Sequence, residues 1–339
     1  MDPLDVVAFA RELIDIDSTT GREGEVAARL ATRLRQRGYS VLEQPLDGAA
    51  GGTARRNVIA AAGEPALVFS THFDCVPPFF PSRIEDGLLF GRGACDAKGI
   101  LAAQVAAAER LRAEGETRVG LVFVAGEERG SDGALAANRI ASRSRYLING
   151  EPTDNRLGAA TRGVFRVRLA TEGRACHSGY PELGRSAIDA LVDLIVDLRA
   201  ADWPEDPVLG RTHHTTGLIS GGVAPNVVSP SAEAEMLFRT VGPHDDVRAV
   251  LHAVVGERGR VTEVLEVPPV RLTTAEGFDT AVFAYTTDIP FLGSWGTPLL
   301  LGPGSIHVAH TDREHVRIAE LHEAVERYVR LARQLLAGV

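Results

Sequence analysis

The stretch Ser70-Thr-His-Phe-Asp-Cys-Val-Pro follows an apolar run, Ala66–Phe69, which predicts a buried parallel β-strand. His72 and Asp74 stand two residues apart at the end of this strand, so we expect their side chains on one face. A carboxylate that accepts a hydrogen bond from one imidazole nitrogen orients the ring and makes the other nitrogen a better metal ligand. The pair is interpreted as a metal-binding histidine and its orienting aspartate, although an isolated His-x-Asp is more often a chance pairing.

A second stretch, Gly91-Arg-Gly-Ala-Cys-Asp-Ala-Lys-Gly, places Asp96 in a glycine-bracketed turn just before a predicted helix at residues 97–114. The glycines allow the backbone to come close to whatever the Asp96 carboxylate binds. In isolation, Asp96 would be interpreted as an ordinary helix N-cap.

Three further apolar runs also stop at or just before residues that can bind metals, and they lead to Glu127-Glu128, Glu151 and His310. The carboxyl ends of parallel strands line one crevice of an open α/β sheet, so we expect these side chains to converge there. Clustered carboxylates need cations. A mixed set of imidazole and carboxylate ligands suits Zn, Co or Mn rather than a thiolate-bound structural zinc.

The order of these motifs resembles the M20 family of co-catalytic zinc peptidases and deacylases. The motifs span nearly the whole chain and are His72-x-Asp74, Gly93-Ala-Cys-Asp96-x-Lys-Gly, Glu127-Glu128, Gly150-Glu151-Pro and Ala309-His310. The segment at residues 302–314, GPGSIHVAHTDRE, is most similar to the acetylornithine deacetylase and succinyl-diaminopimelate desuccinylase branch. The resemblance implies two divalent metal ions, with zinc expected and cobalt or manganese as alternatives.

The resemblance also implies a division of the metal ligands. Asp96 would bridge the two ions, and its peptide bond to Ala97 would be cis. The terminal ligands would be His72 and Glu151 for one ion, and Glu128 and His310 for the other.

Two further catalytic roles are implied in the same region. Asp74 would orient the metal-binding imidazole, and Glu127 would be the general base. Without the family pattern, the two glutamates would be interpreted as an exposed pair with Arg129 as their partner. His307 and His315 are the competitors for the ligand role assigned to His310.

Three residues from the middle of the chain resemble elements that complete the site in this family. His177 would stabilise the oxyanion, from the partner subunit of a homodimer, while Asn226 and Arg239 would hold the substrate. A guanidinium fork suits a substrate carboxylate. Outside the family context, His177 would be a turn residue and Arg239 a surface charge.

Composition limits the partners and the compartment. The chain has 339 residues and a formal net charge of −9, without a long Lys/Arg run, which argues against nucleic acid or an anionic membrane as a partner. The N-terminus, Met1-Asp-Pro-Leu-Asp, lacks the features of a secretory signal, so we expect a cytoplasmic protein. Three cysteines without CxxC spacing are interpreted as small buried residues.

The pattern of elements predicts an α/β fold with two domains. Alternating strands and helices at residues 1–157 and 265–339 predict a doubly wound mixed sheet that carries the metal ligands. Residues 158–264 predict a smaller inserted α+β domain, which the resemblance implies to be a lid and dimer contact. Residues 48–53 are expected to form a turn and residues 77–89 a loop. Residues 277–288 depart from the family pattern, because they are shorter than the helix and strand that relatives usually carry there, so the resemblance does not define this edge of the substrate pocket.

The sequence therefore predicts a dinuclear metal amidohydrolase that removes an acyl group from an N-acyl amino acid, similar to acetylornithine deacetylase of amino-acid biosynthesis. The first alternative is a dipeptidase or carboxypeptidase with the same core, because both reactions cleave an amide beside a carboxylate. The second is a non-catalytic binding homologue, which need not retain the complete set of ligands and the base.

Overall fold

The computed structural model describes residues 2–48 and 54–338, so the turn predicted at residues 48–53 falls largely outside the described residues. The chain forms two compact units. The first unit comprises the chain up to Ala159, Leu272–Ala281 and the chain from Thr287 onwards. The second unit comprises Ala160–Arg271 and Val282–Thr286.

The first unit is built on a six-stranded sheet with the order β1-β2-β6-β3-β7-β17. Strands β6, β3, β7 and β17 run parallel, whereas β1 and β2 are antiparallel to their neighbours. The predicted α/β class with a mixed sheet is confirmed. The strands are β1 (Ser40–Pro45), β2 (Arg56–Ala61), β3 (Leu67–His72), β6 (Val119–Val124), β7 (Tyr146–Asn149) and β17 (Thr297–Leu300).

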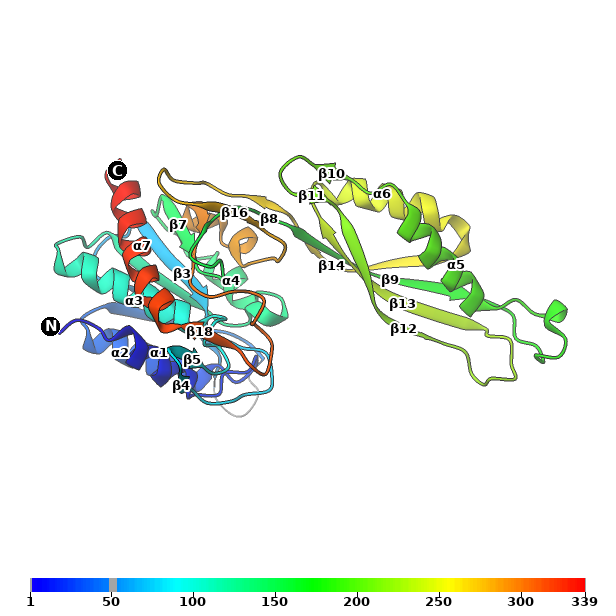
Figure 1. Cartoon of the computed structure of the whole chain (residues 1–339), viewed down its shortest axis with the longest axis horizontal. Helices are drawn as coiled ribbons and strands as arrows, with labels where there is room; N and C mark the ends of the chain where they lie inside the picture. The colour runs from blue at the N-terminus through cyan, green and yellow to red at the C-terminus, as the bar shows by residue number, and fades with distance from the viewer. Residues whose placement is uncertain (1, 49–53, 339) are drawn as a thin grey trace. The chain divides into compact units, whose positions relative to one another are not determined.

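Helices cover both faces of this sheet, because alternate side chains of the buried strands point to opposite sides. Leu67 and Phe69 of β3 belong to a core shared with four helices, whereas Val68 packs in a separate cluster with Ala134 and Trp295. Figure 1 shows α3 and α7 side by side against the sheet. The helices of the first core are α1 (Val6–Ile14), α2 (Gly24–Gln36), α3 (Lys98–Ala113) and α7 (Ile318–Leu336), and α4 (Asp132–Ala137) covers the other face.

A hairpin replaces part of the loop predicted at residues 77–89. Strands β4 (Arg83–Glu85) and β5 (Leu88–Phe90) pair antiparallel, and β18 (His315–Arg317) pairs with β5. Asp86 and Gly87 connect the hairpin with φ values of 50° and 75°. An Asp-Gly pair favours this two-residue turn. The loop prediction holds for residues 77–82 and was wrong for residues 83–89, because it overlooked this turn signal.

The second unit is a two-layer α+β structure with a four-stranded antiparallel sheet in the order β12-β13-β9-β14. Its core is formed by the inner face of the sheet and by α5 and α6, and it includes Phe165, Leu194 and Phe238. Figure 1 shows both helices on the same side of the sheet. The elements are β9 (Gly163–Glu172), α5 (Ala187–Ala200), β12 (His213–Gly221), β13 (Ser231–Thr240), α6 (His244–Val255) and β14 (Arg260–Val267).

The remaining strands are short. A three-stranded sheet has the order β15-β8-β16, and β10 pairs with β11. None of the helices among the described residues is long and apolar enough to cross a membrane. The bounds are β8 (Leu157–Thr161), β10 (Glu205–Asp206), β11 (Gly210–Arg211), β15 (Val270–Arg271) and β16 (Thr280–Phe283).

Candidate metal centre

The predicted ligands gather at the edge of the sheet where the parallel strands end. His72 is the last residue of β3, and Glu151 follows β7 by two residues. Glu127 and Glu128 lie in a 3₁₀ turn after β6 rather than on the strand itself. Gly126 opens this turn with φ of 82°, and a Cβ there would lie 1.9 Å from Oδ1 of Asp132, so the turn requires a glycine.

Two groups of side chains in the described part of the chain place their ligand atoms close enough to hold a metal ion. His72, Asp96 and Glu151 form the first group, and Asp96, Glu128 and His310 form the second. Within each group all ligand atoms lie within 4.8 Å of one another. The structure thus brings together all five residues predicted as metal ligands, with the predicted division between two sites.

Asp96 belongs to both groups through its two different oxygens. Its Oδ1 lies 2.9 Å from Nε2 of His72, and its Oδ2 lies 3.3 Å from Nε2 of His310. Nε2 of His310 is also 3.0 Å from Oε1 of Glu128. A carboxylate that presents one oxygen to each of two histidines has the geometry of a bridging ligand.

Backbone geometry at the ligands is unusual at two points. The peptide bond between Asp96 and Ala97 is cis, as the resemblance implies. His310 has φ of 63°, in the left-handed region that non-glycine residues rarely occupy. A left-handed backbone conformation at a non-glycine residue such as His310 is concentrated at functional sites, where the surrounding structure maintains it.

The charges of the cluster fit divalent cations. Burial raises the pKa of Glu151 well above its usual value, because the positive charge of His72 offsets only part of the lost hydration. Burial raises the pKa of Glu127 in the same way. Oε1 of Glu151 is buried and has no hydrogen-bond partner among the described residues. An unpartnered oxygen among crowded carboxylates is the environment that a bound cation would stabilise.

The histidines complement this negative charge. Hydrogen bonds to Asp96 and Glu128 raise the pKa of His310 to about 10. Burial alone would raise the pKa of Asp96, but the hydrogen bonds from His310 and His72 hold it below its usual value. A mixed set of imidazole and carboxylate donors suits Zn, Co or Mn, so the residues present fit two such ions.

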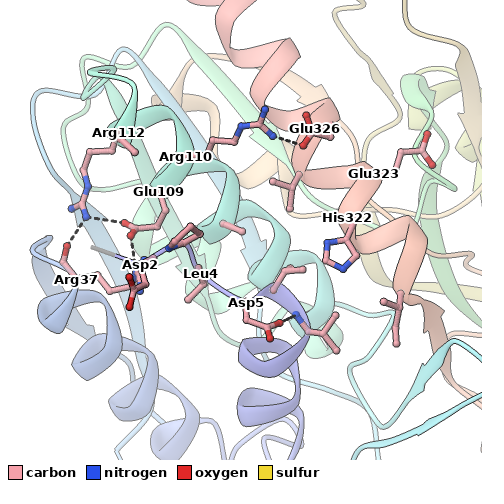
Figure 2. A pocket seen from close by; sticks show the side chains of 17 residues that line it. Asp2, Leu4, Asp5, Arg37, Glu109, Arg110, Arg112, His322, Glu323 and Glu326 are labelled. Atoms are coloured by element: carbon pink, nitrogen blue, oxygen red, sulfur yellow. Dashed lines mark hydrogen bonds and ion pairs between the residues drawn. The ribbon is translucent and has the colours of Figure 1, made fainter.

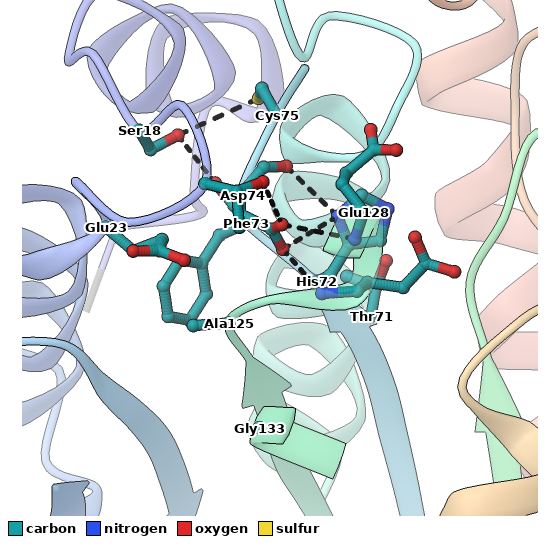
Figure 3. A network of polar contacts seen from close by, with 12 residues as sticks. Ser18, Glu23, Thr71, His72, Phe73, Asp74, Cys75, Ala125, Glu128 and Gly133 are labelled. Carbon is teal, nitrogen blue, oxygen red and sulfur yellow. Dashed lines mark hydrogen bonds and ion pairs between the residues drawn. The ribbon is translucent and has the colours of Figure 1, made fainter. Parts of the chain in front are cut away.

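Asp74 makes contacts that its predicted role did not include. Nδ1 of His72 lies 3.1 Å from the main-chain oxygen of Asp74 and 3.5 Å from its carboxylate Oδ1. The carboxylate accepts hydrogen bonds from the amides of Glu127 and Glu128, at 3.1 and 3.2 Å. It also accepts one from Oγ1 of Thr20 at 2.9 Å. Figure 3 shows Asp74 beside His72 and Glu128. Asp74 therefore links the end of β3 to the Glu127-Glu128 turn.

Two buried carboxylates near the site, Glu314 and Asp288, were not predicted from the sequence. Glu314 is fully buried and bonds to the turn that carries Asp96. Asp288 is also buried, and burial together with the charges of Asp74 and Asp132 raises its pKa to about 7, against the opposing effects of Ser131 and His72. Neither residue follows a parallel strand, so the strand-end pattern gave no signal for them.

The competing histidines lie outside both metal groups of the described residues. Nδ1 of His315 is 2.7 Å from the main-chain oxygen of Arg313, and its ring packs against Phe90. His307 is a member of neither group. The geometry therefore favours His310 as the ligand.

The burial of two of the three cysteines is consistent with the predicted packing role. Cys75 and Cys95 are buried and unpaired, and Cys176 is also a free thiol. Burial raises the pKa of the Cys75 thiol to about 12. A thiol with such a pKa is a poor nucleophile near neutral pH.

Two of the predicted substrate-site residues, His177 and Asn226, are brought together in the second unit. His177 forms an isolated β-bridge with Val227, and the amide of Ser178 donates to the main-chain oxygen of Asn226 at 3.0 Å. Both side chains are exposed. They lie on loops beyond the end of the sheet at which Ser231 pairs with Glu172.

Arg239 lies at the other end of the same sheet. It is half-buried on β13 and pairs with Val164 near the start of β9. Ser231 and Arg239 are eight residues apart along β13, and an extended strand rises about 3.4 Å per residue, so roughly 27 Å separate them. The structure therefore does not place Arg239 beside His177 and Asn226 within one chain's second unit.

A large surface hollow of about 930 Å³ lies elsewhere on the first unit, where α1, α3 and α7 meet. Figure 2 shows its charged residues, which pair with one another: Arg110 with Glu326, and Arg112 with Glu109. None of the predicted site residues lines it.

A mixed α/β sheet with two histidines and several carboxylates at its carboxyl edge can hold the metal ions of a metal-dependent hydrolase. The model of peptidase family M20/M25/M40 matches residues 68–334. A probable carboxypeptidase of Aspergillus terreus is 37% identical over 368 residues, covering 96% of this chain and 85% of the relative. The chain belongs to the M20 peptidase family, and it is a metallohydrolase of that family.

Two solved structures share the fold. The aminopeptidase PepT from Bacillus cereus superimposes with a TM-score of 0.79 at 21% identity, covering 99% of both chains. The YXEP protein of Bacillus subtilis, described as a dinuclear metal-binding peptidase of the M20 family, has a TM-score of 0.73 at 15% identity, with 98% of both chains covered. None of these comparisons supports the acetylornithine deacetylase branch in particular.

Proposed function

We propose that this protein is a dinuclear metallopeptidase that hydrolyses the amide bond next to a free α-carboxylate, as a carboxypeptidase or dipeptidase does. The main support for this proposal is the geometry of Asp96, which places one carboxylate oxygen toward His72 and the other toward His310. The relatives at 33–37% identity that are named probable carboxypeptidases support the choice of substrate class.

Two divalent ions in these groups would lower the pKa of water and polarise the scissile carbonyl. His72, Glu151, Glu128 and His310 would hold the ions, and Asp96 would set their spacing. Glu127 would accept a proton from the attacking water and return it to the leaving amine. Asp74 would keep the base in position, because its carboxylate binds the amides of both Glu127 and Glu128.

Recognition of the substrate carboxylate is assigned to Arg239. It pairs across the sheet with His213, and both burial and the charge of Arg162 lower its pKa. Nη1 of Arg162 lies 2.7 Å from Nδ1 of His213. Among the described residues, Arg162 and Arg239 form no ion pair with an acidic side chain, so this positive group suits an anion.

N-acyl amino acids are the second candidate substrates, because the segment at residues 302–314 resembles the acetylornithine deacetylase branch. Only under this candidate would the protein belong to amino-acid biosynthesis. Both substrate classes present an amide and a carboxylate to the same groups. A non-catalytic role is disfavoured by the complete set of ligands and the base.

A substrate panel separates these candidates. We expect turnover of N-blocked dipeptides with a free C-terminus, in the presence of Zn, Co or Mn supplied separately. C-terminal amidation should lower kcat/KM by about 10²-fold or more, because the half-buried guanidinium of Arg239 would lose its charged partner. Turnover of N-acetyl, N-succinyl and N-formyl amino acids tests the hypothesis that the protein is a deacylase. Equal cleavage of free and amidated peptides would contradict the proposal.

We also propose that the protein works as a homodimer through its second unit and that His177 and Asn226 serve the partner's site. Arg239 lies at one end of the sheet, and His177 and Asn226 lie beyond the other end, which is about 27 Å away at Ser231. A single metal centre is too small to contact both ends. A second copy would supply the other end. Ile188, Val192 and Val196 form an exposed apolar stripe on α5, and β12 is an edge strand with exposed apolar side chains, so both can pack on another copy.

Mixing two inactive variants tests the partner's contribution. In a mixed dimer of His177→Ala and Glu127→Gln, one site would carry both defects and the other neither. With random pairing about half of the dimers are mixed, so we expect about a quarter of the wild-type activity. Activity is measured after subunit exchange, which differently tagged chains verify.

The control mixes Glu127→Gln with Glu127→Ala, which should restore nothing. If exchange occurs and the His177→Ala mixture stays at background, His177 does not act from the partner subunit.

A further inference from the structure

Glu314 is a fully buried glutamate whose carboxylate binds the turn that carries Asp96. Its Oε1 accepts hydrogen bonds from the amides of Gly93, Cys95 and Asp96, at 2.9, 3.1 and 3.1 Å. Its Oε2 accepts one from Nη1 of Arg92 at 2.6 Å. All four contacts come from a single segment, residues 92–96, so the orientation of the Asp96 main chain depends on this side chain.

Hydrogen bonds to a carboxylate are stronger than those to a neutral acceptor. A carboxylate oxygen is therefore well suited to accept hydrogen bonds from three amides. The turn has little freedom to adopt another shape. Gly93 has φ of 89°, and a Cβ there would lie 2.8 Å from Sγ of Cys75. The amide of Asp96 is therefore fixed from one side by Glu314 while the turn packs against Cys75 on another.

Glu314 also connects the two segments that supply ligands. It stands four residues after His310 and directly before β18, whose His315 pairs with Phe90 just ahead of the Asp96 turn. The amide of Gly91 donates to the main-chain oxygen of Glu314 at 3.2 Å. The His310 segment and the Asp96 turn are thus held together at one residue.

The charge of Glu314 is compensated without a metal. Arg92 is buried beside it, with Nε donating to the main-chain oxygen of Pro78 at 3.2 Å and the guanidinium 5.0 Å from the centre of the Phe80 ring. Glu314 is a member of neither metal group among the described residues. Its role is therefore distinct from that of a ligand.

We propose that Glu314 is a positioning residue that holds Asp96 where its two oxygens can reach two metal ions. This inference rests on the bridging role assigned to Asp96 in the proposed function. Partners of this kind that orient metal ligands typically change metal affinity by about 10- to 100-fold when they are removed.

The test measures metal binding rather than turnover. We expect Glu314→Ala to bind Zn²⁺ about 10- to 100-fold more weakly at both sites, by competition with a chelator, since Asp96 serves both. The absorption spectrum of the Co²⁺-loaded variant should also change, because the ligand geometry changes. Glu314→Gln retains one oxygen that can accept the three amides, but its NH2 group would face the Arg92 donor, so it should recover only part of the affinity.

Glu109→Ala is the matched control. Glu109 is also buried in the first unit and pairs with Arg37 and Arg112, but it is far along α3 from the ligands. Its loss should reduce thermal stability and leave the Zn²⁺ affinity and the Co²⁺ spectrum unchanged. Arg92 variants are less suitable controls, because they would leave the Glu314 carboxylate buried without its partner.

The inference is overturned if folded Glu314→Ala binds Zn²⁺ as tightly as the wild type with the same Co²⁺ spectrum, or if Glu109→Ala weakens binding equally. If Glu314→Ala does not fold, Glu314→Asp replaces it: the shorter side chain cannot reach the amides and Arg92 together, and unchanged affinity would again overturn the inference. Failure of the metal site itself is recognised separately, because the wild-type protein would then not bind two ions.

Discussion

Glu127→Gln is expected to lower kcat by about 10²- to 10⁴-fold, the range typical for loss of a general acid-base group, while the protein stays folded and binds two metal ions. Glutamine has nearly the same shape but cannot accept the proton. The Glu127 side chain belongs to neither metal group, so its replacement removes no ligand. Its main-chain amide bonds to Asp74 whatever the side chain is, so the turn should keep its shape.

The adjacent residue provides the matched control for this prediction. Glu128→Gln changes the same functional group one residue away, but Glu128 lies 3.0 Å from Nε2 of His310 and belongs to the second metal group. It should therefore lose metal from that site and regain part of its activity at high metal concentration. The measurement is kcat together with metal content for both variants. A metal-replete Glu127→Gln protein with near wild-type kcat would exclude Glu127 as the base.

The ligand set was predictable from the sequence because its signal is local. Each buried parallel strand is a short apolar run, and the next polar residues must lie at the carboxyl edge of the sheet. His72, Glu128 and Glu151 follow this rule directly. His310 lies ten residues beyond the end of β17, so the strand pattern alone could not distinguish it from His307, and the family resemblance made that choice.

The contacts that support the ligands were not predictable in the same way. The Asp74 carboxylate, which was predicted to orient His72, lies 3.5 Å from Nδ1 of that histidine. The same carboxylate also accepts the amides of a turn more than fifty residues later, and nothing in the sequence indicated this second contact. Glu314 reaches a turn 218 residues away. Such contacts depend on how the loops pack against one another. Neither the periodicity of apolar residues nor the spacing of motifs in the sequence predicts them.

The second unit shows the same limit for the substrate residues. The alternating strands predicted a small α+β structure, but they did not show that Arg239 and His177 lie at opposite ends of one sheet. The position of each depends on the register between β13 and β9, in which Thr240 pairs with Gly163 and Ser231 with Glu172. A strand pattern does not determine that register, because several registers satisfy the same alternation.

Asp96→Ala is expected to abolish tight binding of both metal ions, whereas loss of a terminal ligand should affect mainly one. Its two oxygens face His72 and His310, so the substitution removes one donor from each group. Four-ligand zinc sites are worth roughly 10–16 kcal/mol, or about 2.5–4 kcal/mol per ligand, which corresponds to roughly 10²- to 10³-fold weaker binding at each site. The remaining carboxylates cannot replace it, because Glu151 and Glu128 each belong to only one group.

Metal analysis after dialysis against a weak chelator measures this effect. Glu151→Gln is the comparison, because it removes one ligand from the first group only, and it should retain close to one ion per chain when Asp96→Ala retains close to none. Kinetic activity is less informative here, since both variants lose turnover. Two tightly bound ions in Asp96→Ala would show that the ions are held independently, and the assignment of Asp96 as the bridging ligand would then be wrong.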